Sequence, residues 1–159
     1  MQVPPPANAG IRIQPAGSPE GVQAAAQLFD NEPNPQATER FLTSPDHHLL
    51  LAFDSAAADG AARAPIGMIS GVETTHPDKG TELFLYELAV AENARGRGVA
   101  TQLINALADL LGRQRGCYAM WVVTEQDNAA ANAVYLRAGA QDEEQVVMYS
   151  WDLSERQEP

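Results

Sequence analysis

Short apolar runs and helix-like segments alternate in the first half of the chain. The apolar runs at 11–14, 49–53 and 66–72 have the length and composition of buried strands, and the last two follow each other as a hairpin would. Residues 18–29 carry an apolar stripe at helical spacing, and prolines end it before a second short helix at 36–43. The pattern predicts a strand, two short helices and two antiparallel strands.

The second half has the order of a βαβ unit. It predicts strand, helix, strand, helix and strand at 82–91, 99–115, 117–124, 129–138 and 146–153. The run at 117–124 is apolar on both faces, as expected of a central strand with a parallel neighbour. We therefore expect a mixed α/β sheet, α+β in some schemes, built as a single domain over 11–153. The segments 1–10 and 154–159 are expected to be loose tails.

Acidic residues outnumber basic ones, 21 against 10, for a formal net charge of −11 over 159 residues. This balance disfavours a nucleic-acid partner, because phosphates must be neutralised by Lys and Arg. Half of the basic residues are Arg95, Arg97, Arg113, Arg115 and Arg137. Two interpretations remain open: the acidic surface steers a cationic substrate while the basic segment holds an anionic cofactor, or the surplus acid only keeps the protein soluble.

Targeting and metal signals are both missing from the pattern. No segment reaches the roughly 18 apolar residues needed to cross a bilayer, and residues 1–10 lack the features of an export signal. The single cysteine, Cys117, excludes a disulfide within the chain, so we expect a cytoplasmic protein in which Cys117 packs in the core. His47, His48 and His76 have no metal-site spacing, so no metal is expected. A homodimer remains open.

A glycine-rich turn joins the strand at 82–91 to the helix at 99–115. Gly96 and Gly98 let the backbone approach a ligand, and the helix start points unpaired N–H groups and its positive dipole end at the turn. Arg95 and Arg97 add two positive charges to the turn, which suits a pyrophosphate. A Walker loop would end in Gly-Lys-Ser/Thr and a dinucleotide loop would have a glycine at Thr101, so both are excluded. The alternative is a turn that only connects strand and helix.

The turn resembles the acetyl-coenzyme A signature of the GNAT N-acetyltransferases, Gln/Arg-x-x-Gly-x-Gly/Ala, at Arg95, Gly98 and Ala100. The strands and helices around it follow that family's order. The resemblance implies the GNAT fold, with roughly six to seven strands, about four helices, a bulge in the strand before the turn and a splay between parallel strands four and five. It also implies acetyl-coenzyme A as co-substrate and direct acetyl transfer to an amine through a tetrahedral intermediate.

The same resemblance implies which residues contact the coenzyme. The strand before the turn would pair with the pantetheine arm, and one of its N–H groups would stabilise the developing oxyanion. The turn would bind the diphosphate. The residues implied are Leu88, Ala89, Val90, Arg95, Gly96, Arg97, Gly98, Val99, Ala100, Thr101, Asn128 and Tyr135.

Two side chains are candidates for proton transfer. Glu87 interrupts an apolar strand face whose other positions are Leu83, Leu85 and Ala89, and such surroundings raise the pKa of a carboxyl group toward that of a general base. An ion pair or a strand-edge glutamate is the alternative. The resemblance places the hydroxyl of Tyr135 where it would protonate the leaving thiol. The alternative is a tyrosine that packs on the preceding helix.

Segments at 85–90, 98–105 and 133–135 look like aminoglycoside 3-N-acetyltransferases of the gentamicin type, which have Asp at the positions of Glu87 and Glu125. A small cationic amine is therefore the expected partner. The acidic residues that would bind it are Glu87, Glu125, Asp127, Glu143 and Glu144. As alternatives, Asp127 or Asn128 caps the next helix, and Glu143 and Glu144 form a solvated turn.

Three functions remain open at the level of sequence. The first is acetylation of an aminoglycoside, at its 3-amino group, or of another small polyamine. The second is acetylation of a peptide or protein amine, and the third is a non-catalytic sensor that binds coenzyme A. The presence of both Glu87 and Tyr135 disfavours the sensor, which has no need of proton transfer.

Overall fold

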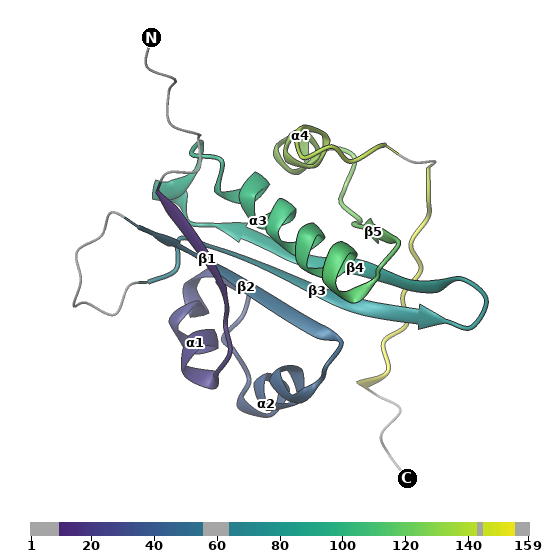
Figure 1. Cartoon of the computed structure of the whole chain (residues 1–159), viewed down its shortest axis with the longest axis horizontal. Helices are drawn as coiled ribbons and strands as arrows, with labels where there is room; N and C mark the ends of the chain where they lie inside the picture. Colours follow the sequence, from purple (N-terminus) through teal and green to yellow (C-terminus); the bar gives the residue numbers. More distant parts are fainter. Residues whose placement is uncertain (1–9, 56–63, 143–144, 155–159) are drawn as a thin grey trace.

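A five-stranded sheet in the order β1-β2-β3-β4-β5 lies at the centre of the computed structural model, which describes residues 10–55, 64–142 and 145–154 (Figure 1). Strands β1 to β4 pair antiparallel, and β5 pairs parallel with β4. The mixed α/β sheet predicted from the sequence is confirmed. The strands are Ile11–Pro15 (β1), His47–Asp54 (β2), Gly67–His76 (β3), Gly80–Val90 (β4) and Ala119–Trp121 (β5).

Helices cover both faces of this sheet. Helices α1 and α2 lie on one side, the α1/α2 face, and α3 and α4 lie on the other, the α3 face (Figure 1). The helices are Pro19–Ala24 (α1), Pro35–Thr43 (α2), Val99–Ala108 (α3) and Ala129–Arg137 (α4), with 3-10 turns at Ala26–Leu28 (η1) and Glu92–Ala94 (η2) and a π-helical segment at Asp109–Gln114 (η3).

Side-chain caps set the starts of α1 and α2. Ser18 accepts a hydrogen bond from the Gly21 N–H (3.1 Å), and Asn34 accepts one from the Ala37 N–H (3.1 Å). Each helix has a proline in its first turn, where a missing N–H costs nothing. The segment 18–29, predicted as one helix, is divided into α1 and η1.

The alternation of side chains along β2 divides the apolar run 49–53 between two cores. One set packs with α1 and α2 and the other packs with α3. Because both faces of the central strands are covered, their sequence reads as a continuous apolar run. The α3 core includes Leu50, Ala52, Ile69, Leu83, Leu85, Leu103, Leu107 and Leu111, and the α1/α2 core includes Val22, Leu28, Leu49, Leu51, Phe53 and Met68.

Two glycines on β3 let α3 lie directly on the sheet. A Cβ atom at Gly67 would come within 2.8 Å of Val99 Cγ1 and 3.1 Å of Leu103 Cδ1. A Cβ atom at Gly71 would come within 2.9 Å of Leu83 Cδ1 on β4 and 3.4 Å of Leu107 Cδ2 on α3. Any larger residue at these positions would push the helix or its neighbours away, so the glycines fix how closely α3 approaches the strands.

A β-bulge interrupts β4, as the resemblance implies. The register pairs Ser70 with Glu87 and Gly71 with Leu85, which leaves Tyr86 as the extra residue on β4. An extra residue inverts the alternation of side chains between the two faces of a strand. The residues on either side of the bulge therefore follow different face patterns.

The bulge moves Glu87 to the α1/α2 face. Leu85 packs in the α3 core before the bulge, and Leu88 and Val90 pack against it after the bulge. Glu87 and Ala89 lie on the opposite face, where Ala89 packs against the α1/α2 core. The prediction that Glu87 shares a face with Leu85 is wrong, because a simple alternation does not include the extra residue.

Strand β5 pairs with β4 over a short stretch only. The pairs run from Glu82 with Ala119 to Phe84 with Trp121. Beyond Phe84, β4 continues to its end without a described partner on this side, and we call this divergence the splay. The splay that the resemblance implies is present. It also explains why the strand predicted at 117–124 is shorter in the structure, since the residues after Trp121 have left the ladder.

The predicted strand at 146–153 does not form in the structure. The described residues 145–154 contain no strand: a strand is stabilised by ladder pairing and by burial of one face, and in the structure this segment has neither. The sheet therefore has fewer strands than the resemblance implies. Large apolar side chains of this segment are exposed, namely Val146, Val147, Met148, Tyr149, Trp151 and Leu153.

The predicted helix at 99–115 forms α3 and continues as η3, in which the turns widen to π-helical geometry. The predicted helix at 129–138 corresponds to α4, which ends one residue earlier. Within the described ranges, none of the helices is both long and apolar enough to span a membrane.

Substitution Gly67→Ala tests the close approach of α3. We expect the free energy of unfolding to fall by about 1–3 kcal/mol, because the added methyl group overlaps Val99 and Leu103. Urea denaturation of the two proteins measures the difference. The control is Gly10→Ala, where a Cβ atom would meet nothing within 4 Å and the midpoint should stay unchanged. Equal midpoints for all three proteins would contradict the packing described here.

Candidate active site

The turn between β4 and α3 leaves main-chain N–H groups without side-chain partners. Gly96 and Gly98 have left-handed backbone angles, with φ of 74° and 79°. Gly98 is the N-cap of α3 and no side chain caps this helix, whereas Ser18, Asn34 and Asn128 cap the other three. The N–H groups of the first turn of α3 therefore face the loop, together with the positive end of the helix dipole.

A cavity of ≈ 440 Å³ opens beside this turn, and we call it the α3 cavity. It runs along α3 from the helix start, and β1 and α4 also contribute to its walls. Arginines from two different elements reach it. The residues that line it are Ile13, Arg97, Gly98, Thr101, Gln102, Asn105, Ala106, Asp109 and Arg137.

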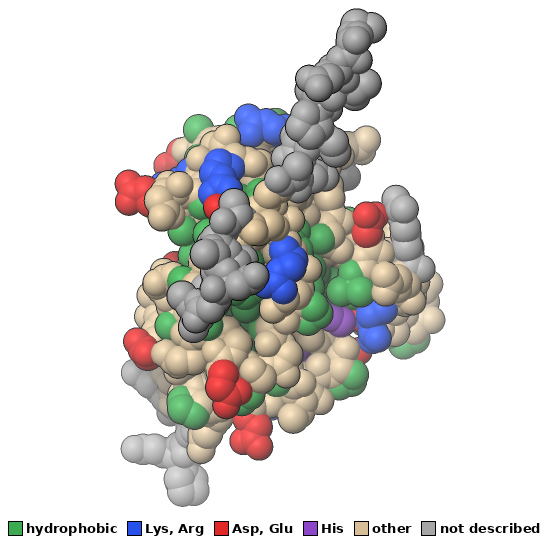
Figure 2. All heavy atoms as spheres, turned by 60° about the vertical axis from the view of Figure 1, so that its left-hand side comes forward, with side chains coloured by type: hydrophobic (Ala, Val, Ile, Leu, Met, Phe, Trp, Pro, Cys, Tyr) green, Lys and Arg blue, Asp and Glu red, His purple; other side chains and the backbone are tan. Residues whose placement is uncertain are grey.

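Charges are unevenly distributed over the surface. On the face drawn in Figure 2, basic and acidic side chains both occur in the upper half, whereas the lower left and the bottom edge carry acidic side chains. The sequence already separates them, since Arg95, Arg97 and Arg137 belong to the segments that form the turn and α4. A positive region within an acidic protein favours an anionic ligand locally.

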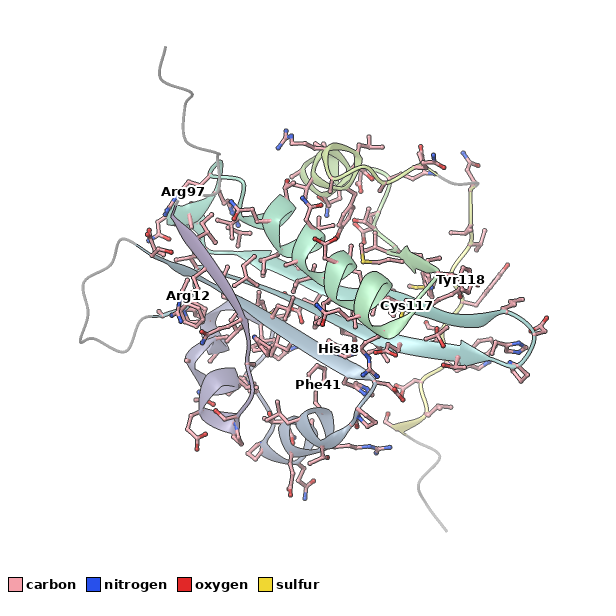
Figure 3. The ribbon with its side chains drawn as sticks, viewed as in Figure 1. Arg12, Phe41, His48, Arg97, Cys117 and Tyr118 are labelled. Carbon is pink, nitrogen blue, oxygen red and sulfur yellow. The ribbon has the colours of Figure 1, made fainter. Side chains whose placement is uncertain are left out.

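Arg97 makes an ion pair with the end of β2. Its Nη2 lies 2.9 Å from Asp54 Oδ2, and both side chains are partly exposed (Figure 3). A pair of this exposure contributes at most about 1 kcal/mol, so its main effect is to hold the turn beside β2. Arg97 also lines the α3 cavity, and Arg95 is exposed. The role of both arginines at a pyrophosphate remains a prediction.

Tyr135 is held on α4 where this helix packs against the α3 core. Val134 and Ala138 pack there with it, and the helix starts at Asn128, whose side chain accepts a hydrogen bond from the Ala131 N–H (3.1 Å). Burial raises the pKa of Tyr135 above its ordinary value, so the hydroxyl keeps its proton at neutral pH. The packing predicted as the alternative is present, and the role of the hydroxyl as proton donor remains a prediction.

Glu87 occupies a partly desolvated position on the α1/α2 face. Burial is the main cause that raises the pKa of its carboxyl group, and the negative charge of Asp30 adds to the rise. The Asp30 main-chain N–H donates a hydrogen bond to the carboxylate, which opposes the rise. No sequence signal identifies Asp30, because only the fold brings the chain after η1 back to β4. A carboxyl group in this state takes up protons closer to neutral pH.

The two candidates for proton transfer approach the splay from opposite faces. Glu87 belongs to the α1/α2 face of β4, and Tyr135 comes from α4 on the α3 face. Because β5 leaves β4 after Trp121, a ligand that lies between the diverging strands would meet side chains from both faces.

Two of the other predicted acidic residues lie in the turn between β5 and α4. Glu125 and Asp127 are exposed in that turn, and the Glu125 carbonyl accepts a hydrogen bond from the Asn128 N–H (3.1 Å). Asn128, rather than Asp127, supplies the side chain that caps α4. Glu143 and Glu144 lie outside the described residues.

A second group of charged side chains lies at the far end of η3, and Figure 3 labels His48 and Cys117 within it. Glu73 lies 2.7 Å from His48 Nε2 and forms an ion pair with Arg115. Burial alone would raise the pKa of Glu73, but its hydrogen bonds to Arg115 and His48 lower it.

Cys117 packs against the α3 core as predicted, and burial raises the pKa of its thiol. Within the described part of the chain, no three His, Cys, Asp or Glu residues are grouped as metal ligands.

The sequence profile of the acetyltransferase (GNAT) family matches residues 20–140, which is most of the chain. The chain belongs to the GNAT acetyltransferase family. It is therefore an N-acetyltransferase by family, and acetyl-coenzyme A is the acetyl donor that GNAT enzymes use.

One curated relative of this GNAT chain is the L-2,4-diaminobutyric acid acetyltransferase of Streptomyces coelicolor. The two are 32% identical over 114 residues, which cover 67% of this chain and 66% of the relative. The chain thus matches just under two thirds of the length of that relative.

Solved structures with the same fold include aminoglycoside acetyltransferases. One is meta-AAC0020 from an uncultured soil metagenomic sample, in complex with sisomicin, with a TM-score of 0.76, 16% identity and coverage of 91% of this chain and 97% of that chain. Another is AAC(6')-Iy in complex with a bisubstrate analogue of coenzyme A, with a TM-score of 0.71, 24% identity and coverage of 89% and 98%. At these identities they establish the GNAT fold.

The turn and the α3 cavity fit the phosphates of the GNAT donor. Uncapped N–H groups and the guanidinium groups of Arg97 and Arg137 are ligands that phosphate prefers. A Cβ atom at Gly96 would meet no atom within 4 Å, so the space outside the turn is open. These residues would hold the donor while the free edge of β4 takes its acyl-bearing arm.

Substitution Gly98→Ala tests the turn as a phosphate site. A methyl group at this position strains the left-handed backbone from which the uncapped N–H groups of α3 begin. We expect the Kd for coenzyme A to rise about tenfold, measured by isothermal titration calorimetry. The matched control is Gly116→Ala. Gly116 has the same φ of 79° but lies outside this turn, so the substitution imposes the same strain and should leave the Kd unchanged. Equal changes in both variants would contradict the assignment.

Proposed function

We propose that this GNAT chain transfers the acetyl group of acetyl-coenzyme A to an amino group of an aminoglycoside antibiotic. The observation that carries the proposal is the splay of β4 and β5 beside the uncapped start of α3, with Glu87 at its edge. The acidic surface supports a polycationic acceptor, and the similarity of fold to aminoglycoside acetyltransferases agrees with it.

The acceptor position proposed is the 3-amino group. The residues that resemble gentamicin-type enzymes, at 85–90 and 98–105, favour it. The solved AAC(6')-Iy structure carries the name of a 6'-acting enzyme, and its identity of 24% supports the fold rather than the position. We place the reaction in the cytoplasm, since the lone Cys117 gives no sign of an oxidising compartment.

In the proposed mechanism, the chain positions the donor and moves two protons. Main-chain groups of Leu88, Ala89 and Val90 on the free edge of β4 orient the donor, and one N–H stabilises the charge that develops on its carbonyl oxygen. The Glu87 carboxylate takes a proton from the acceptor ammonium group, which makes the amine nucleophilic. Tyr135, whose hydroxyl is protonated at neutral pH, donates a proton to the sulfur that leaves, and the second proton lost by the acylated nitrogen restores the hydroxyl.

A second acceptor class is supported by the curated relative. Diamino acids such as L-2,4-diaminobutyric acid are suggested by the name of a protein 32% identical to this chain. They share with aminoglycosides a second cationic group near the reacting amine. Diamino acids are smaller than aminoglycosides, and they carry a carboxylate, which an acidic site disfavours.

An acceptor panel tests the proposed function. Release of free thiol from acetyl-coenzyme A is measured with gentamicin, sisomicin, L-2,4-diaminobutyric acid and a lysine peptide. We expect kcat/KM for the aminoglycosides to exceed the other values at least about tenfold, and NMR of the product to locate the acetyl group on the 3-amino nitrogen. If coenzyme A binds but no amine releases thiol, the chain is a sensor and the proposal is wrong.

The pH dependence of the rate tests the proton acceptor. The unprotonated carboxylate is the active form, so kcat/KM should fall at acid pH with a midpoint above the ordinary pKa of glutamate. Glu87→Gln should lower kcat/KM about 100-fold at neutral pH and remove this acid limb. Tyr135→Phe should lower kcat and keep the limb, because the tyrosine hydroxyl is protonated throughout this range. An acid limb that persists in Glu87→Gln would assign it to another group.

A further inference from the structure

Three aromatic side chains form a continuous surface beside Glu87. Phe84 stacks on Trp121 with ring centroids 4.4 Å apart and 25° between the planes. Phe84 also meets Tyr86 edge-on, with centroids 5.8 Å apart and an angle of 86°. We call these three residues the aromatic ridge. It extends from the last residue pair of β4 with β5 to the bulge, along the edge of the splay.

The aromatic ridge is exposed although its rings contact one another. Tyr86 is 69% exposed and Trp121 is 43% exposed. Helices α1 and α2 lie toward β1 and β2, on the other side of the molecule from β5 (Figure 1). Phe84 falls between two residues that face the α3 core, Leu83 and Leu85, so its ring lies on the α1/α2 face with Glu87. Grouped aromatic side chains at a surface are typical of a binding site.

Negative charge accompanies the aromatic ridge. Glu87 follows Tyr86 directly in β4, and the chain at Asp30 comes close enough to donate its N–H to the Glu87 carboxylate. The faces of aromatic rings carry partial negative charge and attract cations, Trp most strongly. A site with carboxylates and exposed π faces therefore complements ammonium groups, and it repels anionic ligands.

We propose that the aromatic ridge binds a second, non-reacting ammonium group of the acceptor while the first is delivered to Glu87. The acceptors would then be diamines and larger oligoamines, selected over monoamines by cation–π contact with Trp121 and Tyr86. This inference rests on the proposed acetyltransferase function. It assigns Trp121 and Tyr86 to substrate selection, and it gives the bulge a role, because the extra residue places Glu87 on the same face as the aromatic ridge.

A pair of acceptors of equal length tests the proposal. The wild-type enzyme is assayed with 1,4-diaminobutane and with 1-aminobutane, which differ only in the second ammonium group. We expect Trp121→Leu to raise KM for the diamine about tenfold with kcat within about twofold, and to leave KM for the monoamine unchanged. Tyr86→Ser should act in the same direction, and its 69% exposure makes it tolerable to the fold. Trp121→Phe should restore most of the diamine affinity.

The matched control is Tyr118→Phe. Tyr118 is an exposed aromatic residue just before β5 whose hydroxyl donates to Glu82 (2.6 Å), and it is not part of the aromatic ridge. It should change neither KM. If Trp121→Leu and Tyr86→Ser weaken both amines equally, the ridge is structural or binds an uncharged part of the acceptor, and the proposal is overturned while the acetyltransferase function stands.

A binding measurement separates this inference from the proposed function. In Trp151→Phe, Trp121 is the remaining tryptophan, so its fluorescence reports on the ridge directly. We expect 1,4-diaminobutane to change the emission at concentrations about tenfold lower than 1-aminobutane does. If the emission responds in this way while no amine releases thiol, the ridge binds cations and the acetyltransferase function is wrong. Equal responses to both amines overturn the ridge proposal.

Discussion

The divergence of β5 from β4 after three residue pairs is the constraint on which the site depends. A strand that loses its neighbour leaves main-chain N–H and C=O groups that need other partners. In this chain the unpaired stretch of β4 begins after Phe84 and ends directly before the turn that leads into α3. The free edge of β4 therefore leads directly to the uncapped start of α3. A long ligand with phosphates at one end could occupy both.

Two features keep that geometry in place. Gly67 pairs with Val90 at the end of β4 and also lies under Val99 at the start of α3, so one small residue sets the distance between the strand end and the helix start. The ion pair of Arg97 with Asp54 ties the intervening turn to β2. The bulge then decides which side chains meet the opening from the α1/α2 face. Packing and chemistry are thus coupled through a few contacts at the carboxyl end of β4.

The chemistry suggested for the site uses ordinary residues in altered surroundings. Partial burial and the neighbouring Asp30 raise the pKa of Glu87, and burial raises that of Tyr135, so one group tends to accept a proton and the other keeps one to give. The two lie on different faces of the sheet, and in the proposed mechanism they meet the ligand through the splay. The net negative charge of the protein and the π faces of the aromatic ridge favour cations at the proposed acceptor side, whereas the turn favours anions at the proposed donor side.

The sequence by itself determined the order of elements as far as α4, the glycine turn before α3 and the packing of the lone cysteine against the core, because these follow from local hydrophobic spacing and from the φ angles that glycine permits. Only the tertiary structure decided the face of Glu87, the approach of Asp30 and the partner of Arg97. One extra residue at Tyr86 reverses the assignment of the following β4 residues to the two faces of the sheet, and contacts between distant segments leave no local signal. The strand expected at 146–153 does not form, since β-structure depends on pairing and packing with distant segments as well as on a suitable sequence.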